Sequence, residues 1–178
     1  MTGYFYDKKI LAVTALLSGA VMADTMTIPV NLVSSEGVGK NIGEITISET
    51  SYGLLFTPHL KELPPGLHGF HIHENASCDP GLINGKKVPA LAAGGHYDPE
   101  QTNKHLGPYN PEGHLGDLPA LYVNSEGNAE NPVLSPKIKK ISQIKERAIM
   151  IHAGGDNHSD SPAPLGGGGA RLACGIIK

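Results

Sequence analysis

Short segments in which apolar and polar residues alternate recur along the chain, and they constrain its fold more than any other feature. Alternation with a period of two is typical of a strand that buries one face. The 178 residues include 23 glycines and 14 prolines but few aromatics, which favours short strands with turn-rich loops over long helices. We predict eight strands, within residues 25–33, 43–50, 52–58, 67–73, 117–124, 129–135, 147–153 and 170–178.

Two long stretches without this alternation, residues 74–116 and 154–169, separate the later strands. Loops longer than about 12–15 residues in a compact domain are usually functional or disordered, and both stretches are rich in His, Asp, Gly and Pro. Eight antiparallel strands with long crossing loops fit an all-β Greek-key sandwich or barrel. We also expect the turn at 125–128 to close a hairpin, and residues 137–147 to hold one short helical turn.

The N-terminal segment has the features of a secretory signal peptide. Lys8 and Lys9 precede an apolar run that is far shorter than the roughly 20 residues of a membrane-spanning helix. Val21 and Ala23 then place small residues at positions −3 and −1 of a cleavage site. We therefore predict a signal peptide at 1–23 and one exported domain at 24–178, with no membrane insertion once the peptide is removed.

Charge and cysteine content limit the function classes. The net charge of −3 becomes −4 when residues 1–23, which carry a net +1, are removed, so the chain as a whole offers no basic surface for nucleic acid. Export permits a disulfide, and one bridge between Cys78 and Cys174 is the simplest interpretation, with two free thiols as the alternative. A bridge closing a loop of roughly 100 residues would contribute about 4.7 kcal/mol in the chain-entropy model.

Several of the nine histidines are grouped as metal ligands would be. His71 and His73 are two apart on a predicted strand, so both side chains lie on one face. The spaced series His96, His105, His114 and Asp117 supplies three imidazoles and one carboxylate, a tetrahedral zinc set. With His152, the strand histidines make an all-imidazole group that suits copper.

For any single histidine, a surface or hydrogen-bonded core role is the more common one. We expect such a role for His68, as a structural histidine that is hydrogen-bonded to the backbone. We assign no metal to His59 or His158.

Four segments, GFHIHENASC, GGHYDP, GHLGDLPAL and GGGGARLACGII, together resemble the copper/zinc superoxide dismutase family in its bacterial exported branch. The resemblance extends over residues 24–178. It implies a periplasmic enzyme with one copper and one zinc ion, which converts two superoxide anions and two protons into oxygen and hydrogen peroxide. The resemblance implies copper ligands His71, His73, His96 and His152, and zinc ligands His96, His105, His114 and Asp117.

The same resemblance assigns roles to four further residues and to His96. His96 would be shared by both metals, with Asp156 bonding the free ring nitrogens of His71 and His105. Arg171 would bind the substrate anion through its fixed, charged donor fork. Cys78 and Cys174 would form the family's internal disulfide.

Two other functions remain open at this point. The chain could be an exported copper or zinc carrier on the same fold, or a sandwich that has lost its metals. Neither requires a shared His96 or Arg171, and every ligand is present, so the enzyme is favoured. Lys86 and Lys87 either steer the substrate or form a solvated charge pair, and the sequence does not choose between a monomer and a homodimer.

Overall fold

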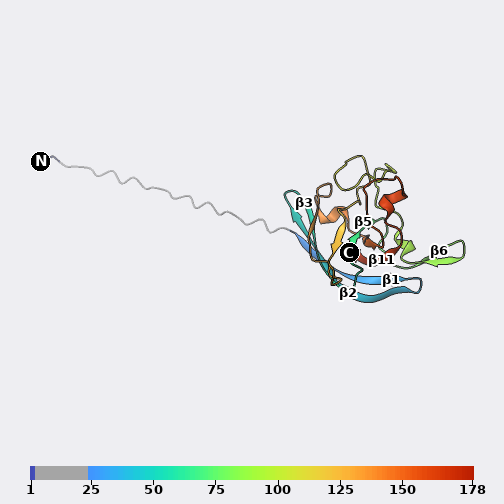
Figure 1. The fold of residues 1–178 in the computed structure, drawn as a ribbon. Helices are drawn as coiled ribbons and strands as arrows, with labels where there is room; N and C mark the ends of the chain where they lie inside the picture. The colour runs from blue at the N-terminus through green and yellow to red at the C-terminus, as the bar shows by residue number, and fades with distance from the viewer. Residues whose placement is uncertain (3–23) are drawn as a thin grey trace.

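The computed structural model describes residues 1–2 and 24–178, so the predicted signal peptide lies almost wholly outside the described residues. The described chain is almost entirely strand and loop (Figure 1). Its eleven strands are β1 (Thr25–Ser34), β2 (Gly37–Thr50), β3 (Gly53–Leu60), β4 (Gly66–His68), β5 (Phe70–His73), β6 (Gly81–Ile83), β7 (Lys86–Val88), β8 (Leu121–Val123), β9 (Val133–Ser135), β10 (Arg147–His152) and β11 (Arg171–Ile177). Three short 3-10 helices are η1 (Leu91–Ala93), η2 (Ile141–Gln143) and η3 (Pro164–Gly167).

The all-β prediction is confirmed, and each of the eight expected segments contains a strand. Gly69 divides the segment 67–73 into β4 and β5, and the helical turn expected in 137–147 is η2. Two further strands, β6 and β7, form a small antiparallel hairpin inside the first long loop. They escaped prediction because three-residue strands are too short to show an alternating pattern.

Seven strands form one antiparallel sheet in the order β5-β10-β11-β1-β2-β3-β9, and β4 and β8 form a separate pair. The sheets curl into a half-barrel around an apolar core (Figure 1). Within it, Phe56 and Phe70 meet edge to face with ring centroids 6.0 Å apart. Ile45 and Ile47 of β2 are fully buried while Thr46 between them is not, as the alternation predicts.

The hairpin predicted between 117–124 and 129–135 is wrong. A turn is present, with the Gly127 amide donating to the Asn124 carbonyl, but the flanking strands part after it. Tyr122 of β8 is paired with Leu67 of β4, and Leu134 of β9 with Leu55 of β3. An alternating pattern fits any antiparallel neighbour, and in this fold the non-local partners are the ones adopted.

Both long loops lie at one side of the half-barrel, except that the hairpin β6–β7 of the first loop projects away from the body (Figure 1). Cys78 near the start of the first loop forms a disulfide with Cys174 of β11, with α-carbons 5.8 Å apart. The first loop is therefore fixed to a central strand of the sheet. Among the described residues, no helix is long and apolar enough to cross a membrane.

Candidate metal centre

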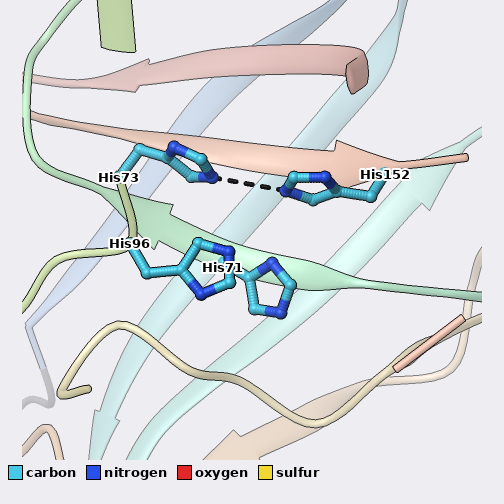
Figure 2. A group of neighbouring side chains, drawn as sticks. All are labelled: His71, His73, His96 and His152. Atoms are coloured by element: carbon cyan, nitrogen blue, oxygen red, sulfur yellow. Dashed lines mark hydrogen bonds between the residues drawn. The ribbon is translucent and has the colours of Figure 1, made fainter. Parts of the chain in front are cut away.

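Three histidines are held by neighbouring strands of the sheet. His71 and His73 lie on β5, opposite Met150 and Ala148 of β10, and His152 ends β10. Figure 2 shows the three rings converging, together with that of His96 from the first long loop. We call His71, His73 and His152 the strand group. With His96, each offers one ring nitrogen, and these four nitrogens all lie within 4.8 Å of one another.

Backbone carbonyls set which nitrogen of His73 and His152 faces the centre. A carbonyl oxygen only accepts, so the ring nitrogen beside it carries the proton. The Nδ1–H of His73 donates to the Gly94 carbonyl at 2.9 Å, and that of His152 to the Gly169 carbonyl at 3.2 Å. The Nε2 atoms of the two rings, each with a lone pair, are then 3.3 Å apart, along the dashed line in Figure 2. Two neutral rings in these tautomers cannot hydrogen-bond there, whereas a cation between them satisfies both.

A carboxylate fixes His71 and His105 in the same way. Asp156, on the second long loop and fully buried at its side chain, accepts a hydrogen bond of 2.7 Å from Nε2 of each ring. Nδ1 of both histidines is thereby left as the free nitrogen, and both are buried without a hydrogen-bond partner. Gly166 lies against this contact, where a Cβ atom would come within 2.0 Å of an Asp156 oxygen. A glycine is therefore required there.

A second group is carried by the first long loop and surrounds Asp117. Its carboxylate oxygens lie 3.0 Å from Nδ1 of His96, 3.1 Å from Nδ1 of His105 and 3.4 Å from Nδ1 of His114. We call His105, His114 and Asp117 the loop group. Isolated backbone bridges pair Asp117 with His71 and His96 with His73, which brings the loop beside β5. Nδ1 of His105 and of His114 lacks a hydrogen bond despite these distances.

His96 connects the two groups. Its Nδ1 faces Asp117, while its Nε2 is buried without a partner on the side of the strand group. Its ring stacks on that of His71 with centroids 3.9 Å apart. A second set of ligand atoms, all within 4.8 Å of one another, comes from His71, His96, His105 and Asp117. This set contains His71 in place of His114, which the sequence analysis predicted as the fourth ligand. His71 is therefore close to both groups.

Burial keeps the strand group neutral. It lowers the pKa of His71 to about 3 and that of His152 to about 4, with the neighbouring His96 adding to both shifts. The pKa values of His73 and His96 are also lowered, mainly by burial. Neutral imidazole is the form that binds a metal ion, so these nitrogens are available across the neutral and mildly acidic range.

His105 behaves in the opposite way. Burial alone would lower its pKa, but its contacts with the carboxylates of Asp117 and Asp156 outweigh burial and raise the pKa to about 9. The same contacts hold the pKa values of both carboxyls below their usual range, although burial opposes this. The loop group thus favours positive charge at its centre, whether carried by a proton or by a metal ion.

Arg171 begins β11 directly opposite His152. Its guanidinium donates to the carbonyls of Ala90 and Gly94, the latter at 2.6 Å. The Gly94 carbonyl also accepts from His73, so one peptide group fixes both the guanidinium and a histidine of the strand group. Partial burial lowers the pKa of Arg171, yet a guanidinium stays charged at neutral pH.

The remaining three histidines belong to neither group. His68 is buried, with its ring nitrogens each 2.7 Å from a backbone carbonyl, of His152 and of Pro64. His59 is exposed, and His158 is only partly buried. Sequence reasoning missed Asp160, whose carboxylate accepts from the His105 amide at 2.9 Å, and Lys137, which reaches the first long loop. No local pattern marks either residue, because each contacts a segment distant in the sequence.

The family model described as copper/zinc superoxide dismutase matches residues 41–177, and the chain belongs to that family. The Cu-Zn superoxide dismutase 1 of Salmonella typhimurium is 62% identical over 94% of this chain and 96% of its own length. The Cu-Zn superoxide dismutase of Escherichia coli is 54% identical over 94% and 97%. The chain is accordingly an enzyme, a superoxide dismutase of the copper/zinc type.

Solved structures support the same conclusion. The Cu/Zn superoxide dismutase from Brucella abortus has a TM-score of 0.85 and 52% identity, covering 87% of this chain and all of its own. The monomeric copper, zinc superoxide dismutase from Salmonella enterica has a TM-score of 0.79 and 57% identity, with the same coverage.

Proposed function

We propose that one copper ion is bound by the strand group with His96, and one zinc ion by the loop group with His96. Copper would be held by Nδ1 of His71 and Nε2 of His73, His96 and His152, and zinc by Nδ1 of His96, His105 and His114 and by Asp117. The observation that carries this proposal is that four buried ring nitrogens at the two centres, on His71, His96, His105 and His114, have no hydrogen-bond partner; among the described residues the one other such ring nitrogen is Nε2 of His158, outside both groups. Buried polar atoms are almost always paired, so four orphans around two centres favour two ions.

The donor sets fit these two metals. Four imidazole nitrogens suit copper, and three imidazoles with one carboxylate form a closed tetrahedral zinc site. We assign His71 to copper although it also lies near the loop group, because His114 supplies a free Nδ1 at 3.4 Å from Asp117.

When bound, copper supplies one-electron chemistry by cycling between two oxidation states, whereas zinc has no redox chemistry. Arg171 binds and orients the superoxide anion through its charged donors, beside His73 and His152. Nε2 of His96 takes up a proton when it is free and gives it to the product. Across the cycle, two superoxide anions and two protons become oxygen and hydrogen peroxide.

The shared role of His96 is tested by loading both sites with Cu(II). Two Cu(II) ions joined by one imidazolate couple magnetically. The electron paramagnetic resonance signal of the parent protein should therefore be weaker than its copper content would give if the ions were independent. His96→Gln removes the shared ring and should restore the full signal for whatever copper it retains. The matched control is His59→Gln at an exposed histidine, which should behave like the parent. A full signal from the doubly loaded parent would contradict the shared ligand.

We infer that residues 1–23 are a signal peptide and that the mature enzyme works in the periplasm, as a monomer or homodimer. The charged start, short apolar run and small residues before Asp24 support export, and the disulfide Cys78–Cys174 suits an oxidising compartment. The mature N-terminus, sequenced from a periplasmic fraction, should be Asp24. A chain that retains residues 1–23 would refute this.

A further inference from the structure

Lys137 lies between β9 and η2, in a segment that belongs to neither long loop, yet its ammonium group points to the first of them. Nζ donates to the Gly107 carbonyl at 2.9 Å and to the His114 carbonyl at 2.5 Å. The side chain is partly buried. The proposed reaction uses no part of this residue.

The two carbonyls mark the ends of the segment 107–114, and each is linked to the loop group. The Gly107 amide donates to the Asp117 carboxylate at 3.3 Å. His114 is itself a member of the loop group, and its carbonyl also accepts from the Asp117 amide at 3.3 Å. One ammonium group thus fixes the backbone on both sides of the Asp117 carboxylate.

The local charges agree with this arrangement. Burial lowers the pKa of Lys137, while the carboxylates of Asp117 and Asp98 partly offset it. A half-buried ammonium group is costly unless its donors are satisfied, and here backbone carbonyls of the loop satisfy two of them. A bound cation at the loop group would repel this charge, so the benefit of Lys137 must come from the geometry that it imposes.

We propose that Lys137 is a positioning residue of the zinc site, which ties the loop carrying His105 and His114 to the segment after β9 so that the loop group stays in its metal-binding geometry. This inference rests on the proposed zinc site. Removing the tether should speed zinc release and leave copper retention unchanged, since Lys137 has no contact with the strand group in the described structure.

The test measures zinc transfer from the copper- and zinc-loaded enzyme to a chromogenic chelator. Lys137→Met, which keeps an unbranched side chain only one atom shorter but removes its donors, should release zinc roughly tenfold to hundredfold faster, the cost typical of losing a partner that orients ligands. Lys137→Arg retains charge and donors and should remain within about threefold of the parent, a margin that corresponds to a weak surface contact. Copper content should be equal in all three.

Lys139→Met is the matched control. Lys139 also donates to a backbone carbonyl, that of Tyr52, at 3.0 Å. Tyr52 is far along the chain from the residues of the loop group. Zinc release from Lys137→Met equal to that from Lys139→Met would overturn the proposal, as would Lys137→Arg releasing zinc as fast as Lys137→Met. If Lys137→Met does not fold, Lys137→Gln, with one short amide donor group, takes its place with the same criteria.

Two further measurements separate this proposal from its premise and from a general stabilising role. A parent enzyme that binds no zinc would refute the zinc site itself and, with it, the positioning role of Lys137, whereas a zinc-binding parent whose release rate matches that of Lys137→Met would refute the positioning role alone. The melting temperatures of metal-free and zinc-loaded protein are compared for each variant. Lys137→Met should lose part of the zinc-induced increase, whereas an equal drop in both forms would show a merely structural residue.

Discussion

The two halves of the metal centre are built on different kinds of backbone. The strand group lies on β5 and β10, which are paired through four consecutive residues in the main sheet. The loop group lies on the first long loop, whose positions near the site depend on single contacts such as the bridge between His71 and Asp117. Strand positions are fixed by a ladder of backbone hydrogen bonds, whereas loop positions are fixed one contact at a time.

The halves also differ in charge. The strand group consists of imidazoles whose pKa values are lowered by burial, so it is neutral before any ion binds. The loop group contains the Asp117 carboxylate, which attracts a proton or a cation to His105. The strand group is therefore prepared by the fold, whereas the loop group depends on its ion and on its tethers.

The largest effect of a single substitution should come from removing the carboxylate of the loop group. Asp117→Ala deletes the anionic ligand and leaves three histidines without their common partner. Zinc affinity should fall by more than the roughly hundredfold that loss of an orienting partner costs, because a ligand itself is lost. Copper bound to the strand group should remain. Metal content after dialysis checks this, with Asp79→Ala at an exposed residue as control. Loss of both metals in equal proportion would remove the distinction between the halves.

Much of this organisation could be predicted from the sequence, and the two halves again differ. His71, His73 and His152 lie on segments whose alternation places them on strands, so their shared face follows from local pattern. The positions of His105 and His114 depend on contacts with Asp156 and Lys137 that no local pattern contains. For the loop group, the spacing and donor types of the residues indicated a zinc set, and the likeness to a known family added which ligand is shared and what bonds His105. The wrong hairpin at 125–128 has the same cause, since strand pairing is decided by distant residues.

The two halves should lose their metals at different pH values when the protein is acidified, zinc first and copper later. The pKa of His105 is about 9, so below that pH a proton competes with zinc, and zinc affinity should fall about tenfold per pH unit. The pKa values of His71 and His152 are about 3 and about 4, so protons compete with copper only near those values. Between pH 8 and pH 5, zinc affinity should thus drop about a thousandfold, while copper affinity changes little. Metal analysis after dialysis at each pH tests this, and copper leaving first would contradict it.

Asp156 is the residue that contacts both halves, so its removal should affect both. Asp156→Ala frees Nε2 of His71 and of His105, and the affinities for copper and for zinc should each fall roughly tenfold to hundredfold. Asn157→Ala is the control, because the side chain of this adjacent residue bonds only backbone groups of its own loop: it donates to the Ser161 carbonyl and accepts from the Ser159 amide. Competition with chelators of known affinity measures both constants. If only one metal were affected, Asp156 would belong to that half alone.

Arg171 should separate metal binding from turnover, because it adjoins the strand group without offering a metal ligand. Arg171→Ala should retain both metals and lose about tenfold to hundredfold in activity, since a hydrogen bond to a charged group contributes about 1.5–3 kcal/mol. Arg171→Lys keeps the charge without the planar fork and should lie between the two. Full metal content with full activity in Arg171→Ala would show that the guanidinium has only a structural role.

The smallest effect concerns two lysines outside both halves, on the projecting hairpin. Lys86 is exposed, and Lys87 makes only a loose contact of 3.7 Å with Glu36, so both charges face solvent. If they steer superoxide, replacing both by Ala should lower activity about twofold at low salt, the scale of exposed charge interactions. The difference should vanish at 1 M salt, where the Debye length is about 3 Å. Salt dependence equal to that of the parent would show a solvated pair with no part in guidance. In that case the attraction for the anion would rest with Arg171 and the metal ions, that is, with the strand group and its immediate surroundings.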